Sequence, residues 1–108
     1  MKLEVYHIDA FTSENFEGNP ACVILLKDWL NDDLLLKIAK LNAIPETAFI
    51  VIEENYFKLR WFTPDIEMDL CGHATLAAAH FIKNILNHSK NHIKFKSCSG
   101  ELNVTLKN

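Results

Sequence analysis

An Ala-rich segment constrains the fold of this chain more than any other feature. The residues ATLAAAHFI, at 74–82, are apolar or small on nearly every face of the helix that they predict. A helix without a polar face is surrounded by protein on all sides rather than lying on a surface. Its alanines leave little bulk, so neighbouring backbone can come close. We therefore expect a buried helix from His73 to Leu86, with the other elements arranged around it.

Strand-forming segments supply the surroundings of that helix. Apolar alternation and β-branched residues predict strands within the segments LEVYHIDAF, ACVILL, ETAFIVIE, YFKLRWF, HIKFKSCSG and ELNVTLKN. The third and fourth segments flank a short ENY turn and predict a hairpin, and the last two close the chain around a Ser-Gly turn. An α+β fold follows, in which a curved sheet or β-barrel wraps around a central buried helix.

One further helix is expected on the surface, within the segment DWLNDDLLLKIAKLN. Asn31 or Asp32 is its predicted N-cap, because a side-chain oxygen there accepts a hydrogen bond from the first turn. The apolar stripe expected to face the sheet consists of Leu34, Leu35, Ile38 and Leu41.

Composition limits the class of protein. The chain has 108 residues and a net charge of −3, which predicts one domain spanning residues 1–108 and no attraction to nucleic acid or to an anionic membrane. Its apolar runs are short and its N-terminus is polar, so a cytoplasmic protein is expected. The cysteines Cys22, Cys71 and Cys98 form an odd set without a CxxC pair and predict reduced thiols. No residues have zinc-ligand spacing, so no metal is expected.

The triplet Cys71-Gly72-His73 stands where the central helix begins. A helix N-terminus offers unpaired N–H groups and partial positive charge, which bind a carboxylate. Gly72 lets a ligand approach the backbone, His73 can give or take a proton, and the helix end lowers the pKa expected for the Cys71 thiol. The structural alternative is a buried cysteine, a turn glycine and a histidine at the start of a helix.

Two other polar residues are candidates. Glu46 stands between Pro45 and an apolar strand, where partial burial would suit its carboxylate to acid/base work, and a solvated connector glutamate is the alternative. Asn19, in the segment GNPA, could contact a polar ligand or belong to an ordinary turn. The single histidines His7 and His80 are expected in core or surface roles.

Four segments together carry a resemblance. DAFTSENFEGNPACVILL, IPETAFI, LRWFTPDIEMDLCGHATLAAAH and SGELNVTL follow one another over nearly the whole chain. In this order they are similar to the N-terminal half of the phenazine-biosynthesis PhzF-like family, whose members are relatives of diaminopimelate epimerase. RWFTP through CGHATLAAAH is the most specific part. Pro45 is a departure, because many relatives carry a serine before the glutamate.

The resemblance implies a diaminopimelate epimerase-like fold of two pseudo-symmetric domains, of which this chain has one. It implies isomerase activity without a cofactor, on a small carboxylated metabolite bound in the cleft between the domains. The position of Glu46 is that of the general acid/base, and His73 is expected to assist catalysis. Gly72 and His73 correspond to the end of the helix that holds the ligand carboxylate. Cys71 corresponds to one catalytic cysteine of the epimerases.

Three functions are compatible with the sequence. The first is proton transfer by Glu46, and the second is an epimerase-like reaction with Cys71 as a thiol base. The second needs a partner thiol that neither Cys22 nor Cys98 supplies in the matching motif. The third is a truncated or split half-protein that acts through association, either as a homodimer or with a separate second domain.

Overall fold

The structure, a computed structural model, describes residues 3–10, 19–42 and 44–106; at residues 9, 10, 19 and 20 it describes only the backbone. Two helices and seven strands lie within these residues. In chain order they are β1 (Glu4–Ala10), β2 (Asn19–Leu26), α1 (Asp32–Asn42), β3 (Glu46–Ile52), β4 (Phe57–Phe62), β5 (Glu67–Met68), α2 (Gly72–Asn84), β6 (His92–Ser97) and β7 (Gly100–Thr105).

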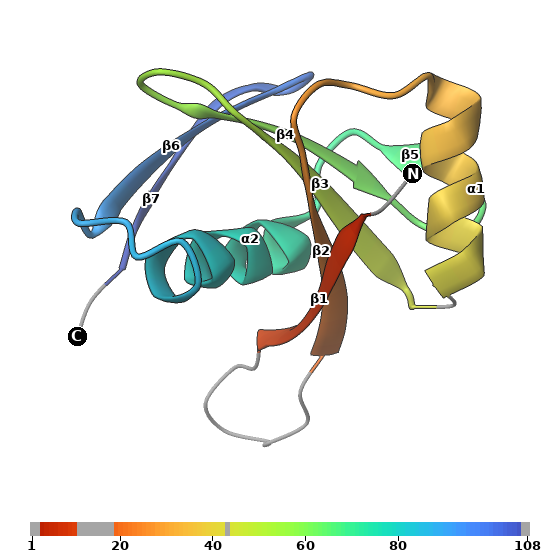
Figure 1. The fold of residues 1–108 in the computed structure, drawn as a ribbon, viewed down its shortest axis with the longest axis horizontal. Coiled ribbons are helices and arrows are strands. Elements are labelled where there is room, and N and C mark those ends of the chain that lie inside the picture. Colours follow the sequence, from red (N-terminus) through yellow and green to blue (C-terminus); the bar gives the residue numbers. More distant parts are fainter. Residues whose placement is uncertain (1–2, 11–18, 43, 107–108) are drawn as a thin grey trace.

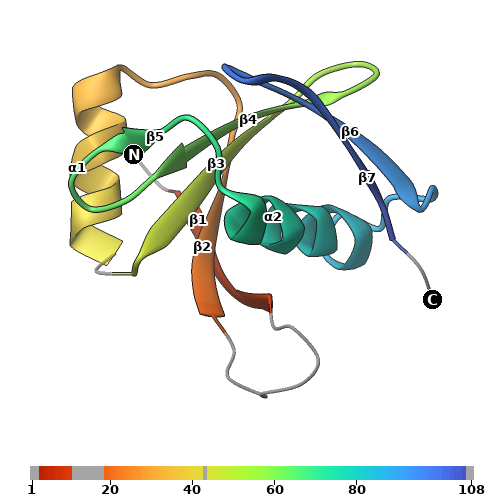
Figure 2. The same ribbon diagram turned by 180° about the vertical axis from the view of Figure 1, so that it is seen from behind.

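The strands form one mixed sheet in the order β1-β2-β3-β4-β6-β7, with the short β5 paired to the end of β4. The pairs β1–β2, β3–β4 and β6–β7 are antiparallel, which confirms the two predicted hairpins. The pairs β2–β3 and β4–β6 are parallel. Parallel neighbours need a crossover, and the two helices serve in these connections. The sheet curves around α2, while α1 lies on its outer side (Figures 1 and 2). The predicted α+β fold is confirmed.

The larger core lies between α2 and the concave face of the sheet. Its helix side is built mainly from small residues, and its sheet side from alternate residues of the strands; the buried members include Ala74, Ala77, Ala78, Phe81, Ile82, Ala21, Val23, Ala48, Ile50, Leu59, Trp61, Ile93 and Phe95. Alanines on the helix let the curved sheet approach it closely, as the composition predicted.

The prediction that protein surrounds α2 on all sides is wrong for one strip of the helix. Leu76 is 42% exposed and His80 is also exposed. These residues are four apart, so they lie on the same side of the helix, and Gly72 continues the strip by one more turn. The apolar sequence shows that each side of the helix tolerates burial, but it does not show which sides are in contact with the rest of the fold. The helix also begins one residue earlier and ends two residues earlier than expected.

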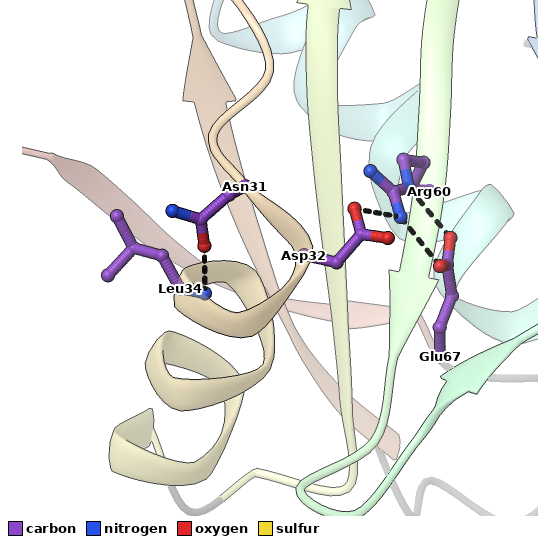
Figure 3. A network of polar contacts seen from close by, with 5 residues as sticks. All are labelled: Asn31, Asp32, Leu34, Arg60 and Glu67. Atoms are coloured by element: carbon purple, nitrogen blue, oxygen red, sulfur yellow. Dashed lines mark hydrogen bonds and ion pairs between the residues drawn. The ribbon is translucent and has the colours of Figure 1, made fainter.

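A second core joins α1 to the outer face of the sheet. Leu35 and Ala39 are fully buried there, and Asn31 is the cap: its Oδ1 accepts a hydrogen bond of 2.8 Å from the Leu34 amide (Figure 3). The prediction for Leu41 is wrong, because its side chain is 77% exposed. At roughly 100° per residue, Leu41 lies about 200° around the helix from Ala39, away from the sheet.

Arg60 of β4 ties α1 and β5 to the sheet. Its Nε and Nη2 donate to the two carboxylate oxygens of Glu67 at 2.7 and 2.6 Å, and Nη2 also donates to Asp32 at 2.9 Å (Figure 3). The rings of Trp29 and Phe62 each lie 5.4 Å from the guanidinium carbon. The bidentate bond to Glu67 raises the pKa of Arg60 further, with a smaller contribution from Asp32. This network holds β5 in place just before the chain enters α2.

In the described part of the chain, no helix combines the length and the apolar character that crossing a membrane requires.

Candidate active site

The chain brings Glu46 and Cys71 together at one end of α2. Glu46 is the first residue of β3, and Cys71 is the residue just before the helix. The Cys71 Sγ donates to Glu46 Oε1 over 3.8 Å, although 25 residues separate the two in sequence. The helix α2 packs against β1, β2 and β3, and the contact with Glu46 places the N-terminal end of α2 within side-chain reach of the start of β3. Two residues that the sequence singled out separately therefore share one site.

The backbone of Cys71 is fixed from the core. Cys71 has the extended conformation of an N-cap residue, with φ −142° and ψ 99°. Its carbonyl accepts hydrogen bonds from the Thr75 amide at 3.0 Å and from Thr75 Oγ1 at 2.7 Å. The indole N–H of Trp61 in turn donates to Thr75 Oγ1 at 3.0 Å. A chain of hydrogen bonds thus runs from the buried face of β4 to the first residue of the site.

Sequence reasoning missed Trp61 and Thr75 as supports of the site. A tryptophan in a strand with buried neighbours needs an acceptor for its indole N–H, and that requirement was a usable signal. Nothing in the sequence identified Thr75 as the acceptor, since fourteen residues separate the two.

The pKa expected for the Cys71 thiol requires correction. Burial raises it above the ordinary value of 9.0, and the neighbouring carboxylate of Glu46 adds to the rise. The backbone amides of Ala74 and His73 act in the opposite direction, as a helix N-terminus should, but they do not prevail. The side chain is only 7% exposed. Cys71 therefore has a neutral thiol at neutral pH and is not an activated thiolate.

Gly72 lies at the surface, beside this pair. A Cβ placed on it would meet no atom within 4 Å, and its φ is not in the left-handed region. Neither crowding nor backbone conformation within the described protein requires glycine at this position. The amides of the first helical turn, including that of half-buried His73, begin here. An open helix end of this kind can accept a carboxylate without interference from a side chain.

The structure places the backbone of Asn19 at the same edge of the sheet. Asn19 is the first residue of β2, two positions before Ala21, which pairs in parallel register with Glu46. Its side chain, and the preceding turn that includes Gly18, lie outside the part of the chain that the structure describes. The expected ligand contact of Asn19 stays a prediction.

Other candidate groups lie elsewhere. The imidazole Nδ1 of His7 lies 3.7 Å from Sγ of Cys22, but Cys22 is fully buried. Depressions of about 770, 430 and 420 Å³ occur on the surface, and neither Glu46 nor Cys71 lines any of the three. All three cysteines are free. Among residues 3–10, 19–42 and 44–106, no cluster of three His, Cys, Asp or Glu side chains could hold a metal ion.

Comparison with known proteins identifies a matching protein family. The family model described as phenazine biosynthesis-like protein matches residues 8–108. An uncharacterized isomerase of Pseudomonas aeruginosa is 46% identical over 104 residues, which are 96% of this chain but 40% of that protein. A phenazine biosynthesis-like domain-containing protein of Bos taurus is 48% identical over an alignment 114 residues long. This alignment covers 94% of this chain and 38% of the relative.

A solved structure shows the same arrangement of elements. The PhzF-family phenazine biosynthesis protein of Enterococcus faecalis superposes with a TM-score of 0.92 at 46% identity. The match covers 100% of this chain and 42% of that one. The chain thus spans about two fifths of the length of the relatives that it matches.

Proposed function

The chain belongs to the phenazine biosynthesis-like (PhzC-PhzF) protein family, and from this membership we propose that it carries the acid/base half of an isomerase site. The reaction is proton transfer on a small carboxylated metabolite, with Glu46 as the general acid/base. A proton leaves one carbon of the substrate to Glu46 and returns to another position. Reactant and product have the same atoms and oxidation level, so the reaction needs no external oxidant or reductant.

The observation that supports this proposal best is the contact of 3.8 Å between Glu46 and Cys71 at an open helix end. A general base must lie within hydrogen-bonding reach of the proton that it removes. A substrate whose carboxylate is held at the start of α2, beside the amide of Gly72, would lie near Glu46, because Cys71 directly precedes that amide. His73 follows Gly72 in the same helical turn and is the second candidate for proton transfer.

Cys71 has a different part in this proposal. Its neutral thiol donates a hydrogen bond to the Glu46 carboxylate, which orients the base. An epimerase-like mechanism, with Cys71 itself as the base, would need a thiolate that burial disfavours. We therefore assign proton transfer to Glu46 and orientation to Cys71.

Exchange of solvent deuterium into carbon tests the assignment without a known substrate. A panel of small carboxylated metabolites is incubated with the protein in D₂O and analysed by mass spectrometry. Glu46→Gln should abolish incorporation while the circular dichroism spectrum stays unchanged, because the amide keeps the shape but cannot accept the proton. A Glu46→Gln variant that incorporates deuterium at the wild-type rate would exclude this mechanism.

A second proposal concerns the wall that faces the site. Three large apolar side chains near the start of α2 are exposed: Ile66 at 60%, Leu70 at 54% and Leu76 at 42%. Exposed large apolar side chains on the segment around a candidate site are typical of a surface that another protein unit covers. Since the relatives are about two and a half times as long as the matched segment, we propose that a further domain, or a second copy, covers this surface and completes the cleft.

Analytical ultracentrifugation tests the association. The chain alone should sediment as a dimer if a second copy covers the surface. The chain mixed with the C-terminal remainder of the Enterococcus faecalis relative should sediment as a heterodimer if a further domain covers it. Leu70→Glu and Leu76→Glu should each weaken the complex by at least about tenfold, because a buried charge replaces an apolar contact. Leu41→Glu is the matched control, since Leu41 is an exposed residue of α1 and this helix lies on the opposite side of the sheet from α2. A monomer under both conditions would contradict the proposal.

A further inference from the structure

The connection between β4 and α2 delivers Cys71 to Glu46, and side chains hold it in several places. At its start, Thr63 Oγ1 accepts hydrogen bonds from the amides of Asp65 and Ile66 at 3.1 and 3.0 Å. In its middle, β5 pairs with β4 and binds Arg60. After β5 only Asp69 and Leu70 remain before Cys71, so the contacts of these two residues decide how firmly the thiol is placed.

Two side-chain donors to this last stretch come from the turn between β6 and β7. The hydroxyl of Ser99 donates to the carbonyl oxygen of Asp69, thirty residues earlier in the chain. The thiol of Cys98 donates to the same oxygen over 3.7 Å and is the weaker donor of the two. These two bonds are not part of a helix or of a strand pairing, because Asp69 lies outside the helices and strands.

The turn that presents Ser99 is itself held in one conformation. The Ser99 amide donates to Ser97 Oγ at 3.1 Å, and that hydroxyl donates to the Gly100 carbonyl at 3.1 Å. Gly100 has a φ of 106°, a backbone conformation that is strained for residues with a side chain but not for glycine. These bonds brace the turn that presents the Ser99 hydroxyl, which ties the second hairpin to the entrance of α2.

We propose that Ser99 is a positioning residue for the Glu46 site. By holding the Asp69 carbonyl, it determines where the Cys71 thiol and the amide of Gly72 lie relative to the Glu46 carboxylate. Ser99 touches no reacting atom, and its effect passes through two residues of backbone. The consequence for turnover rests on the proposed function, whereas the effect on Cys71 does not.

Residue-resolved alkylation of Cys71 in the full chain, measured by mass spectrometry from pH 7 to 10, tests this positioning directly. Ser99→Ala should raise the alkylation rate of Cys71 by about fivefold, the factor expected when one net hydrogen bond is lost. The midpoint of the pH profile should move down toward the ordinary thiol value, because a loosened Cys71 is less buried. Ser99→Thr keeps a hydroxyl and should restore both quantities.

Controls separate positioning from general stability. Ser89→Ala changes an exposed serine in the loop after α2 and should leave the Cys71 profile unchanged. Cys98→Ala removes the weaker donor and should give a smaller rise, which supplies the test if Ser99→Ala does not fold. Hydrogen exchange should increase in residues 69–75 but not in β3. Equal increases in both segments, or an unchanged Cys71 profile in Ser99→Ala, would overturn the proposal.

The same variants report separately on the proposed function, because alkylation and hydrogen exchange need no substrate. If Glu46→Gln keeps full deuterium incorporation while Ser99→Ala alters Cys71 as described, the acid/base assignment fails and the positioning stands. If Ser99→Ala leaves Cys71 unchanged while Glu46→Gln is inactive, the positioning fails alone.

Discussion

The thiol of Cys71 lies 3.8 Å from the carboxylate of Glu46, and it donates a hydrogen bond to that carboxylate. The two residues belong to different crossover units of the sheet, with Glu46 at the start of β3 and Cys71 just before α2. Their contact places a neutral donor beside a candidate base at the open end of a helix.

Replacement of Cys71 by serine should preserve most of the activity. A serine hydroxyl donates to Glu46 as the thiol does, so the rate of solvent-deuterium incorporation should fall by no more than about threefold, within the range of one altered hydrogen bond. Cys71→Ala removes the donor and should cost more. A loss of several orders of magnitude in Cys71→Ser would instead indicate that the thiol is the base.

Stability should fall in alkaline solution. Burial raises the pKa of both Cys22 and Cys71 above 9.0, so the folded state holds these protons more tightly than the unfolded state does. This contribution to the free energy of unfolding is fully present below pH 9 and is lost as the pH rises through the folded-state values. In urea unfolding between pH 8 and 10.5, the free energy of unfolding should decline less steeply with pH in Cys71→Ser than in the wild type. Identical slopes would contradict the raised pKa of Cys71.

Alanine at position 72 should separate stability from ligand binding. Because a Cβ there meets no protein atom, Gly72→Ala should fold normally and gain up to about 1 kcal/mol by restricting the unfolded chain. The same methyl group would occupy the approach of a carboxylate to the helix amides. Deuterium incorporation should therefore fall at least tenfold, as expected for a misplaced substrate, while the melting temperature does not. Full turnover in Gly72→Ala would remove the helix end from the site.

Thr75 supplies a test of the support beneath Cys71. Thr75→Val keeps the shape of the side chain but leaves the buried indole N–H of Trp61 without its acceptor, at a cost of about 1–3 kcal/mol. Thr75→Ser is the matched control, because its hydroxyl can still bridge Trp61 and the Cys71 carbonyl. The free energies of unfolding of the two variants measure the difference, and equal values would show that the bridge contributes nothing.

Sequence patterns predicted most of the elements because those elements depend on neighbouring residues. The Asn31 cap and the two hairpins are local features of this kind. The contact between Cys71 and Glu46 could not be predicted from pattern alone, because two crossover connections create it. The exposure of Leu76 was missed since apolar composition does not show which side of a helix stays exposed. The thiol pKa was misjudged because the helix end suggested one direction and burial, invisible in the sequence, imposed the other.

Deuterium incorporation by matched variants of position 46 tests the central claim most directly. Wild type, Glu46→Gln and Glu46→Asp are each assayed alone and with the C-terminal remainder of the Enterococcus faecalis relative. We expect incorporation by wild type in at least the mixed sample, a residual rate in Glu46→Asp, and a loss of at least about a hundredfold in Glu46→Gln, the range of general acid/base catalysis. Equal incorporation by wild type and Glu46→Gln, or none by any variant in either sample, would contradict the assignment of Glu46.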